Sequence, residues 1–325
     1  LPYWQMALTA TDANRFSIRL ARKLTGRSKI LVFNYCYHGT VDETFCTLEN
    51  GKEVSRQGNL GPPVDPAITT RVVEFNDLEA LEKALAKGDI ACVLAEPAMT
   101  NIGIVLPEPG YHKALRELTE KYGTLLILDE THTICTGPGG YTGAHDLKPD
   151  ILTLGKPIAS GVPAAVYGFS EKIAGLVAQL TSTEDCDTIG IGGTLAGNAL
   201  SVKVIRATLD KVLTVSAFEH AIPLAKKFAY EVEEVIARYE LSWIVKQLGA
   251  RAEYWFSSTP PLNGGEAKAT VDNDLDKYMH LAALNRGILM TPFHNMALFS
   301  AAHSQDDVRQ HTSVFEESVR LLVQQ

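Results

Sequence analysis

The sequence lacks the features that mark membrane, nucleic-acid-binding and P-loop proteins. No apolar run approaches the roughly 18 residues of a membrane-spanning helix, and no signal peptide is recognisable. The formal net charge of −8 and the absence of any Lys/Arg cluster disfavour nucleic acid and anionic membranes as partners. The run G-x-x-x-x-G-K-[ST] is also absent, which argues against a nucleoside triphosphatase.

Cysteines are few and scattered along the chain. The five residues are Cys36, Cys46, Cys92, Cys135 and Cys186, an odd number without any C-x-x-C pair. This usage is typical of reduced thiols and predicts a cytoplasmic protein.

The length and composition predict an ordinary globular protein with two domains. The chain has 325 residues, of which 46% are hydrophobic and 21% charged. It starts LPYWQMALTATDAN without an initiating Met, so we expect an N-terminal portion to be absent from the sequence. We expect a large domain over residues 1–205 and a smaller C-terminal domain over residues 206–325.

Helical and strand patterns alternate through the expected large domain, which predicts an α/β fold with a mostly parallel sheet. The expected helices are a segment from Thr9 to Gly26, a segment from Asn76 to Gly88 in which Asn76 and Glu79 form a capping box, and residues 110–123. The expected strands are residues 29–34, 90–97, 125–129, 151–155 and 164–169.

Longer helical patterns follow in the expected small domain, which we predict to be α+β. They cover residues 198–213 and the neighbourhood of 228–239, and an amphipathic helix follows Ser304. Strand patterns cover residues 251–256 and 288–293, and the Gly- and Pro-containing run 259–267 predicts a loop.

Two chemically useful side chains stand at the ends of expected strands. Asp129 closes the apolar run LLILD, and ligands of open α/β sheets bind at the carboxyl ends of such strands. Lys156 follows ILTLG and is flanked by Gly155 and Pro157, which hold it on a constrained loop. A lysine that attacks carbonyls and a carboxylate for a pyridinium nitrogen together indicate pyridoxal phosphate, although each alone is a common surface residue.

Such a cofactor also requires a phosphate site and aromatic cover. The segment Thr9-Ala10-Thr11-Asp12 opens a helix and can bind an anion, although a plain N-cap is an equally good interpretation. The glycine-rich run 192–198 is a second candidate, and Tyr37 can stack on a planar ring.

Spaced motifs along nearly the whole chain resemble one family. DETHT, PDILTLGKPIASGVPAAVYG, GRSKILVFNYCYHG, LAEPAMTNIGIVLPEPGYHKALRELTEKYGTLLILDE and GGTLAGNAL stand here in family order. The sequence is therefore similar to the class III, pyridoxal-phosphate-dependent aminotransferases, in particular the branch with glutamate-1-semialdehyde aminomutase and β-amino-acid aminotransferases. This resemblance implies fold type I, with a mostly parallel seven-stranded sheet and a smaller α+β C-terminal domain.

The resemblance also assigns roles by position. It implies that Lys156 forms the Schiff base with the cofactor and transfers the proton, while Asp129 pairs with the pyridine nitrogen. The resemblance places the phosphate site at Thr9, Ala10 and Thr11, and the stacking aromatic at Tyr37 with His38 beside it. It places Asn101 near the ring hydroxyl, Glu96 at the start of the same motif, and Thr131 and His132 by the ring. Thr194 matches a threonine that in the family reaches the phosphate of the neighbouring subunit of a homodimer.

Two departures from the family pattern affect the cofactor site. TATDA stands in place of Ser-Gly-Thr-Glu-Ala, so Ala10 replaces a glycine that approaches the phosphate. Thr131 and His132 follow the acidic pair where the family commonly has Val, which places polar groups near the ring and can alter cofactor contacts or substrate choice.

The expected function is transamination from an amine or amino acid to a keto acid or aldehyde by a ping-pong mechanism. The alternative is a 2,1-aminomutase of the glutamate-1-semialdehyde type. Arg251, Arg286 and His294 are candidates for substrate recognition, although such residues are more often structural. A metal site of Asp129, His132 and His145 and a scaffold without cofactor are weaker alternatives, and we expect no metal.

Overall fold

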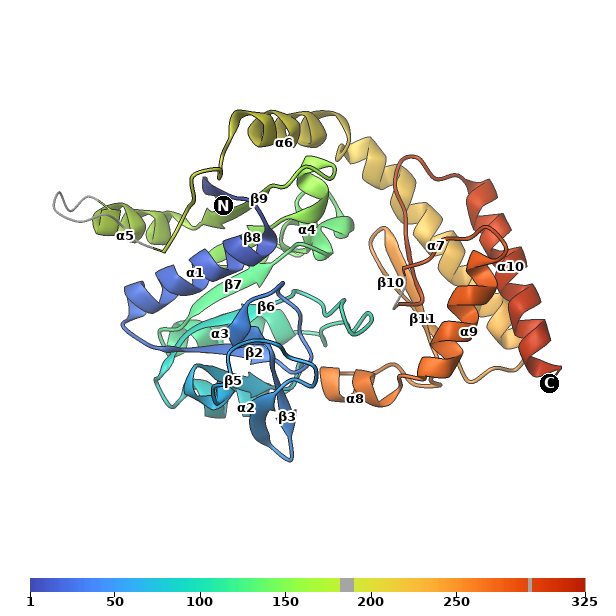
Figure 1. Cartoon of the computed structure of the whole chain (residues 1–325), viewed down its shortest axis with the longest axis horizontal. Helices are drawn as coiled ribbons and strands as arrows, with labels where there is room; N and C mark the ends of the chain where they lie inside the picture. Colours follow the sequence, from blue (N-terminus) through green and yellow to red (C-terminus); the bar gives the residue numbers. More distant parts are fainter. Residues whose placement is uncertain (182–189, 292–293, 325) are drawn as a thin grey trace.

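The computed structural model describes residues 1–181, 190–291 and 294–324, and its largest unit is a seven-stranded sheet (Figure 1). The strand order is β1-β9-β8-β7-β6-β2-β5, and β9 alone runs against the other six. The strands are β1 (Tyr3–Ala7), β2 (Lys29–Phe33), β5 (Thr70–Val73), β6 (Ile90–Ala95), β7 (Leu125–Asp129), β8 (Ile151–Leu154) and β9 (Ala165–Phe169). The prediction of a mostly parallel, seven-stranded α/β sheet is confirmed.

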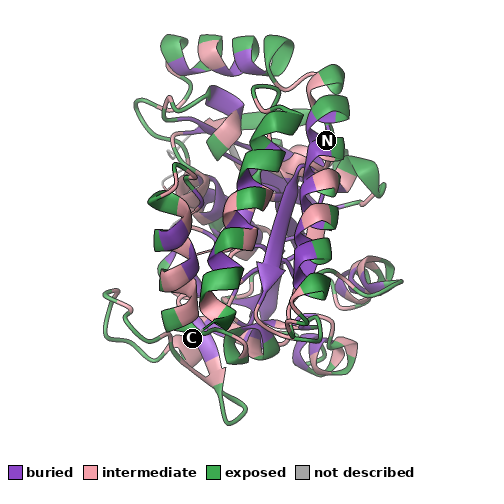
Figure 2. Cartoon of the chain, turned by 90° about the vertical axis from the view of Figure 1, so that its right-hand side faces the viewer, coloured by how far each residue is buried: buried purple, intermediate pink, exposed green. Residues whose placement is uncertain are grey.

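Helices cover both faces of this sheet, which explains why its strands are apolar without alternation. Along β2, Ile30 and Val32 pack on the face covered by α1 and α5, while Leu31 and Phe33 pack on the face covered by α2 and α3. The interior strands are accordingly buried, and the outer helix faces are exposed (Figure 2). The four helices are α1 (Ala10–Thr25), α2 (Leu78–Leu85), α3 (Tyr111–Lys121) and α5 (Glu171–Thr181).

The C-terminal part contains a three-stranded antiparallel sheet, and long helices lie beside it (Figure 1). Phe228, Tyr254 and Phe315 are central to its core. Its strands are β10 (Ile244–Leu248), β11 (Arg251–Trp255) and β12 (Met296–Leu298), and its helices are α7 (Val215–Arg238), α9 (Asn273–Leu284) and α10 (Gln305–Val323). The helix α6 (Ala199–Lys211) contains the expected boundary between residues 205 and 206, which stays a prediction.

Most predicted helix ends are confirmed, with one correction. The Thr9 side chain caps α1 by accepting a hydrogen bond from the Asp12 amide at 3.1 Å, and Gly26 ends it with φ +67°. The predicted cap of α2 at Asn76 is wrong, because Asp77 caps this helix through the Ala80 amide at 2.8 Å. Asn76 instead has φ +68°, and its side-chain amide donates to two loop carbonyls.

Two further predictions about the C-terminal part are wrong. Residues 288–291 of the expected strand 288–293 are not a strand, residues 292–293 lie outside the described residues, and the strand is instead β12. The expected loop 259–267 contains the start of α8 (Gly264–Ala269), which Asn263 caps through the Glu266 amide at 2.9 Å. The strands β1, β5 and β10, the hairpin of β3 (Cys46–Glu49) and β4 (Lys52–Ser55), and the helices α4 (Gly140–Ala144), α5 and α9 were not predicted.

The start of α8 packs tightly against the loop after β2, and we predict that Gly264→Ala destabilises the protein. A Cβ at Gly264 would overlap the carbonyl oxygen of Asn34, and a backbone group cannot move aside like a flexible side chain. We expect a loss of about 1–3 kcal/mol in the free energy of unfolding, measured by urea denaturation.

Gly175→Ala in α5 is the matched control, since a Cβ there meets nothing within 4 Å. It should be neutral or stabilise the protein by up to about 1 kcal/mol. Equal effects of the two substitutions would contradict the packing argument.

Candidate functional site

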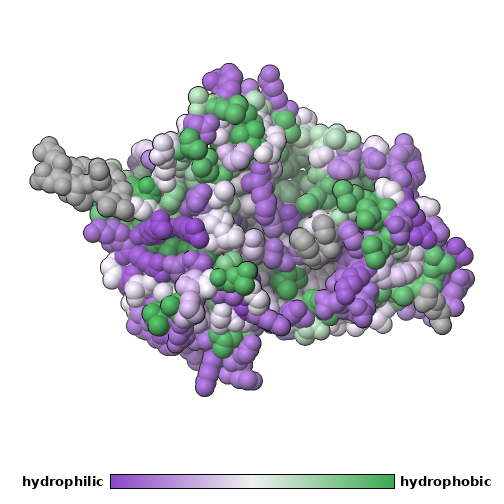
Figure 3. Space-filling view, viewed as in Figure 1, coloured by the Kyte–Doolittle hydropathy of each residue, from purple (hydrophilic) through white to green (hydrophobic). Residues whose placement is uncertain are grey.

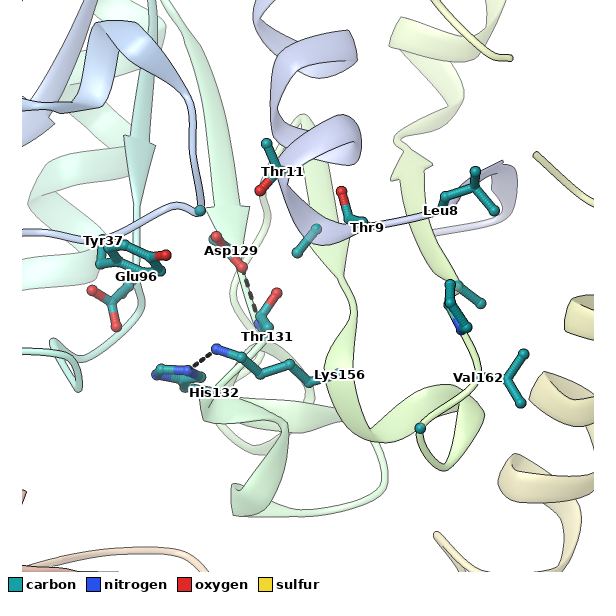
Figure 4. A pocket seen from close by; sticks show the side chains of 15 residues that line it. Leu8, Thr9, Thr11, Tyr37, Glu96, Asp129, Thr131, His132, Lys156 and Val162 are labelled. Carbon is teal, nitrogen blue, oxygen red and sulfur yellow. Dashed lines mark hydrogen bonds between the residues drawn. The ribbon is translucent and has the colours of Figure 1, made fainter. Parts of the chain in front are cut away.

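A cavity of about 350 Å³ lies at the carboxyl ends of the paired strands β7 and β8 (Figure 4). Asp129 is the last residue of β7, and Lys156 follows β8 after Gly155. The structure therefore brings the predicted acid and the predicted amine to one cavity. Its lining includes nine of the predicted cofactor-binding residues, namely Thr9, Ala10, Thr11, Tyr37, Glu96, Asp129, Thr131, His132 and Lys156.

Local backbone geometry holds Lys156 beside the first turn of α1. A Cβ at Gly155 would lie 3.0 Å from the Cβ of Ala10, so glycine permits this close approach. Lys156 itself has φ +48°, in the left-handed region that a lysine rarely occupies. Such conformations cluster at functional sites, because the surrounding structure must enforce them.

Asp129 is a buried, charged acceptor. Only 4% of its surface is exposed, and its oxygens accept hydrogen bonds from Asn14 Nδ2 at 2.8 Å and from the Thr131 amide at 3.0 Å. His38 Nδ1 lies 3.0 Å from the Asp129 Oδ2. Burial alone would raise the pKa of Asp129, but these donors, His38 foremost, hold that pKa well below its usual range.

His38 contacts Asp129 but does not line the cavity. Burial lowers the pKa of His38, but Cys36 and Asp129 outweigh this and raise the pKa to about 10. We therefore describe His38 and Asp129 as a buried ion pair. The prediction that His38 contacts the cofactor directly receives no support from this geometry.

Asn14 is a site residue that the sequence analysis missed. It is fully buried in α1, donates to Asp129 and to the His38 carbonyl at 3.1 Å, and accepts from Thr153 Oγ1 at 2.7 Å. The available signal was its spacing, because Asn14 shares a helix face with the apolar residues Ile18 and Ala21. A polar side chain on a buried face needs a hydrogen-bond partner, and here that partner is Asp129.

A second hydrogen-bonded chain begins at the amine of Lys156. The Lys156 Nζ contacts His132 Nε2 (Figure 4), and His132 Nδ1 lies 2.7 Å from Thr100 Oγ1. Thr100 in turn donates to the buried Glu96 through its hydroxyl at 2.5 Å and its amide at 3.0 Å. Burial, together with the neighbouring Lys156 and Arg251, lowers the pKa of His132 to about 3. Partial loss of hydration likewise lowers the pKa of Lys156.

A larger cavity of about 970 Å³ adjoins the first and shares Tyr37, Thr131, His132 and Lys156 with it. In the view of Figure 1, the molecular surface is hollowed between the large sheet and the C-terminal helices (Figure 3). The other lining residues are mainly apolar, and among those the structure describes none is acidic. They include Ile134, Val212, Leu213, Phe218, Ala221, Met296, Leu298 and Phe299.

Two of the three candidates for substrate recognition line this cavity. Arg251 lines it, is 5% exposed, and its Nε has no hydrogen-bond partner among the described residues. His294 lines it too, with its Nδ1 3.4 Å from the buried Glu253. Arg286 does not line it, and donates instead to Glu317 at 3.1 Å on the outer surface.

The remaining predictions fall outside the smaller cavity. Asn101 lines the larger cavity, whereas Thr194 is exposed and lines neither of the two.

The described residues contain no group of three or more His, Cys, Asp or Glu side chains suited to a metal. His145, from the alternative metal site, stacks on Tyr141 with ring centroids 4.0 Å apart. No described helix is long and apolar enough to cross a membrane.

Comparisons with known proteins identify the family. The sequence profile described as aminotransferase class-III matches residues 4–314. The chain belongs to the class III aminotransferases. The glutamate-1-semialdehyde 2,1-aminomutase of Chloroflexus aggregans is 34% identical to this aminotransferase. The match covers 95% of the present chain and 72% of the aminomutase.

Solved structures agree with this assignment. A glutamate-1-semialdehyde-aminomutase from Pseudomonas aeruginosa PAO1 in complex with PMP is 47% identical, with a TM-score of 0.96 over 98% of this chain and 72% of that one. An omega-transaminase from Sphaerobacter thermophilus is 24% identical and shares the fold, with a TM-score of 0.85. The match covers 98% of this chain and 74% of that transaminase. The aminotransferase therefore has fold type I and uses pyridoxal 5′-phosphate.

The residues of the smaller cavity fit this cofactor. Thr131 Oγ1 and Glu96 Oε1 are buried there without hydrogen-bond partners among the described residues, as expected of a site built for a polar ring. The charged Asp129 suits a pyridinium nitrogen, and the start of α1 suits a phosphate. Tyr37, 37% exposed at the cavity wall, offers an aromatic face.

We predict that the ion pair of His38 and Asp129 makes stability depend on pH. The pKa of His38 is about 10 in the folded protein against 6.5 ordinarily, so its stabilising effect is complete below pH 6.5 and is lost as the pH rises through 10. At pH 6, His38→Gln should reduce the free energy of unfolding by about 3 kcal/mol, since removing one partner leaves a buried charge.

The measurement is urea denaturation of the wild type and His38→Gln between pH 6 and 10. The difference between the two proteins should shrink as the pH rises, and a difference independent of pH would contradict the ion pair. His145→Gln is the control, because His145 is exposed and stacks on Tyr141.

Proposed function

We propose that the enzyme is a transaminase that transfers an amino group from an amino acid donor to a carbonyl acceptor by a ping-pong mechanism. The observation that carries this proposal is the position of Lys156, in the wall shared by the smaller cavity and the larger, mainly apolar one. An amine there can serve both a cofactor in the first cavity and a substrate in the second. The first product leaves before the acceptor binds.

The residues of the smaller cavity would hold the cofactor. Asp129 would bind the pyridine nitrogen, Tyr37 would cover a ring face, and Thr9 and Thr11 would bind the phosphate through the start of α1. Bound pyridoxal phosphate supplies an electron sink that makes the α-hydrogen of the donor acidic. Lys156 then moves that proton at its Nζ atom, a role supported by a pKa that loss of hydration lowers.

Arg251 supports an amino acid, rather than a simple amine, as the donor. Its guanidinium is buried in a cavity whose described lining contains no acidic residue, and a buried charge is stable only with a partner. A donor carboxylate would provide that partner, and the apolar wall suits a hydrophobic side chain. Arg286, bound to Glu317, has no part in this proposal.

A 2,1-aminomutase is the second candidate, because the relatives at 34% and 47% identity bear that name. The two reactions differ in whether a product leaves between the half-reactions. With the donor as the only added substrate, a transaminase releases one carbonyl product per active site and stops. An aminomutase converts the whole substrate pool into an isomer.

We propose a homodimer as the working unit, located in the cytoplasm. Thr194 is exposed and outside its own chain's cavities, as a residue that serves a neighbouring subunit would be. The described cysteines Cys36, Cys46, Cys92 and Cys135 are free, in keeping with a reducing compartment, and Cys186 lies outside the described residues. Sedimentation of the purified protein tests the dimer.

Lys156→Ala is predicted to lower turnover by about a hundredfold or more, because the described lining of the cavity contains no other lysine. The measurement is release of carbonyl product from a panel of amino donors, together with loss of the absorbance of the lysine-bound cofactor. Lys113→Ala, on the exposed face of α3, is the control and should retain full activity. Turnover that persists in folded Lys156→Ala protein would refute the role of Lys156.

Arg251→Met is predicted to affect only donors that carry a carboxylate. For those donors kcat/KM should fall about thirtyfold or more, equivalent to about 2 kcal/mol or more, through the loss of a buried charged hydrogen bond. Donor amines without a carboxylate serve as the internal control and should change little. An equal loss for both classes of donor would show that Arg251 only maintains the structure.

A further inference from the structure

The contact between Lys156 and His132 is a feature of this chain that the proposed cofactor site does not use. His132 follows Thr131, which stands where the family commonly has Val, and it lies 24 residues before Lys156. Its ring nevertheless contacts the Nζ atom of Lys156 directly (Figure 4). The imidazole is therefore within reach of the atom that moves the proton.

The hydrogen bonds behind His132 determine which ring nitrogen carries the hydrogen. Glu96 Oε2 accepts from the Thr100 amide at 3.0 Å, so this oxygen is an acceptor and the Thr100 hydroxyl donates to it at 2.5 Å. The hydroxyl oxygen of Thr100 is then the acceptor for His132 Nδ1–H at 2.7 Å. His132 Nε2 is left with a lone pair, and this lone pair faces Lys156.

The lone pair has a physical consequence for Lys156. Partial loss of hydration disfavours the ammonium form of this lysine and prevails, although Asp129 and Glu96 favour that form; the nearby Arg251 disfavours it further. Yet a base that removes a proton must become an ammonium, so its surroundings have to accept that charge. An imidazole nitrogen without a hydrogen can accept a hydrogen bond from the ammonium and replace part of the lost hydration.

We propose that His132, fixed as the Nδ1–H tautomer by Thr100 and Glu96, accepts a hydrogen bond from the ammonium form of Lys156 and thereby makes Lys156 a stronger base. This inference rests on the role of Lys156 in the proposed function. During the reaction the proton passes from the donor carbon to Lys156 Nζ, and the N–H that faces His132 Nε2 stays on the lysine. His132 itself remains uncharged throughout.

Five charged or titratable groups surround His132 and have to be considered together. Lys156, Arg251 and His294 disfavour a second positive charge on its ring, and Asp129 favours one. Glu96 lies beyond Thr100, and burial raises its pKa. Burial and the two cations prevail and lower the pKa of His132 to about 3, so the ring is a neutral acceptor at neutral pH.

The test measures how readily Lys156 reacts in the cofactor-free protein as a function of pH. The probe is a small amine-specific acylating reagent, and modification at Lys156 is quantified by peptide mass spectrometry. His132→Leu removes the acceptor, and the reactivity profile of Lys156 should move about one pH unit to lower pH, a tenfold change in its ammonium equilibrium. His132→Gln keeps an acceptor oxygen and should stay near the wild type.

Two further variants separate this role from general packing. Thr100→Val keeps the side-chain shape but removes the oxygen that accepts from His132 Nδ1–H, so the hydrogen is no longer fixed on one ring nitrogen. The reactivity profile should therefore shift in the same direction as in His132→Leu, by less. ¹⁵N spectra of histidine-labelled protein should show Nδ1–H at His132 in the wild type and a mixture of tautomers in Thr100→Val. His145→Gln is the control and should leave the profile unchanged, since His145 lies away from the cavity, against Tyr141.

The outcomes distinguish the inference from the proposed function. Identical profiles for the wild type and His132→Leu, or for the Leu and Gln variants, would overturn the role of His132 while leaving transamination by Lys156 intact. Turnover by Lys156→Ala would instead overturn the proposed function. In the loaded enzyme, the isotope effect of an α-deuterated donor should increase in His132→Leu and stay near the wild type in His132→Gln.

Discussion

A carboxylate with almost no access to water has to stay charged for this site to function, and Asp129 is that carboxylate. Its charge is maintained by Asn14 from α1, by the paired His38 from the loop after β2, and by the Thr131 amide. Each donor belongs to a different segment. The position of one buried charge therefore depends on the packing of the whole parallel sheet, and the fold and the cofactor site cannot be separated energetically.

The parallel arrangement of β7 and β8 brings two opposite chemical groups together. Because both strands end at one edge, the acid at the end of one and the amine after the other meet in a single cavity. Their surroundings then separate them chemically, since hydrogen bonds keep Asp129 charged while loss of hydration lowers the pKa of Lys156. One cavity thus contains a permanent anion and an amine that can exchange its proton.

Much of the large sheet was predictable from the sequence, because buried parallel strands such as β2 and β7 are continuous apolar runs that end at polar residues. The ends of strands also located Asp129 and Lys156. The strand β1 was not predicted because YWQMA carries no alternation, and its position at the sheet edge depends on pairing with β9.

The cap of α2 was misplaced by one residue, since Asn76 and Asp77 are both good capping residues and tertiary contacts of Asn76 decided between them. Similarly, no local pattern shows that Asn14 meets Asp129, which is 115 residues away.

The distribution of charge around the larger cavity has a consequence for the approach of ligands. The chain as a whole carries a formal net charge of −8, yet the described lining of this cavity contains Lys156 and Arg251 and no carboxylate. Cationic side chains in the wall of a cavity attract small anions toward its opening, even when the molecule as a whole is negatively charged. Encounter with an anionic molecule should thus be faster than random diffusion to the opening would allow, and added salt should remove that advantage.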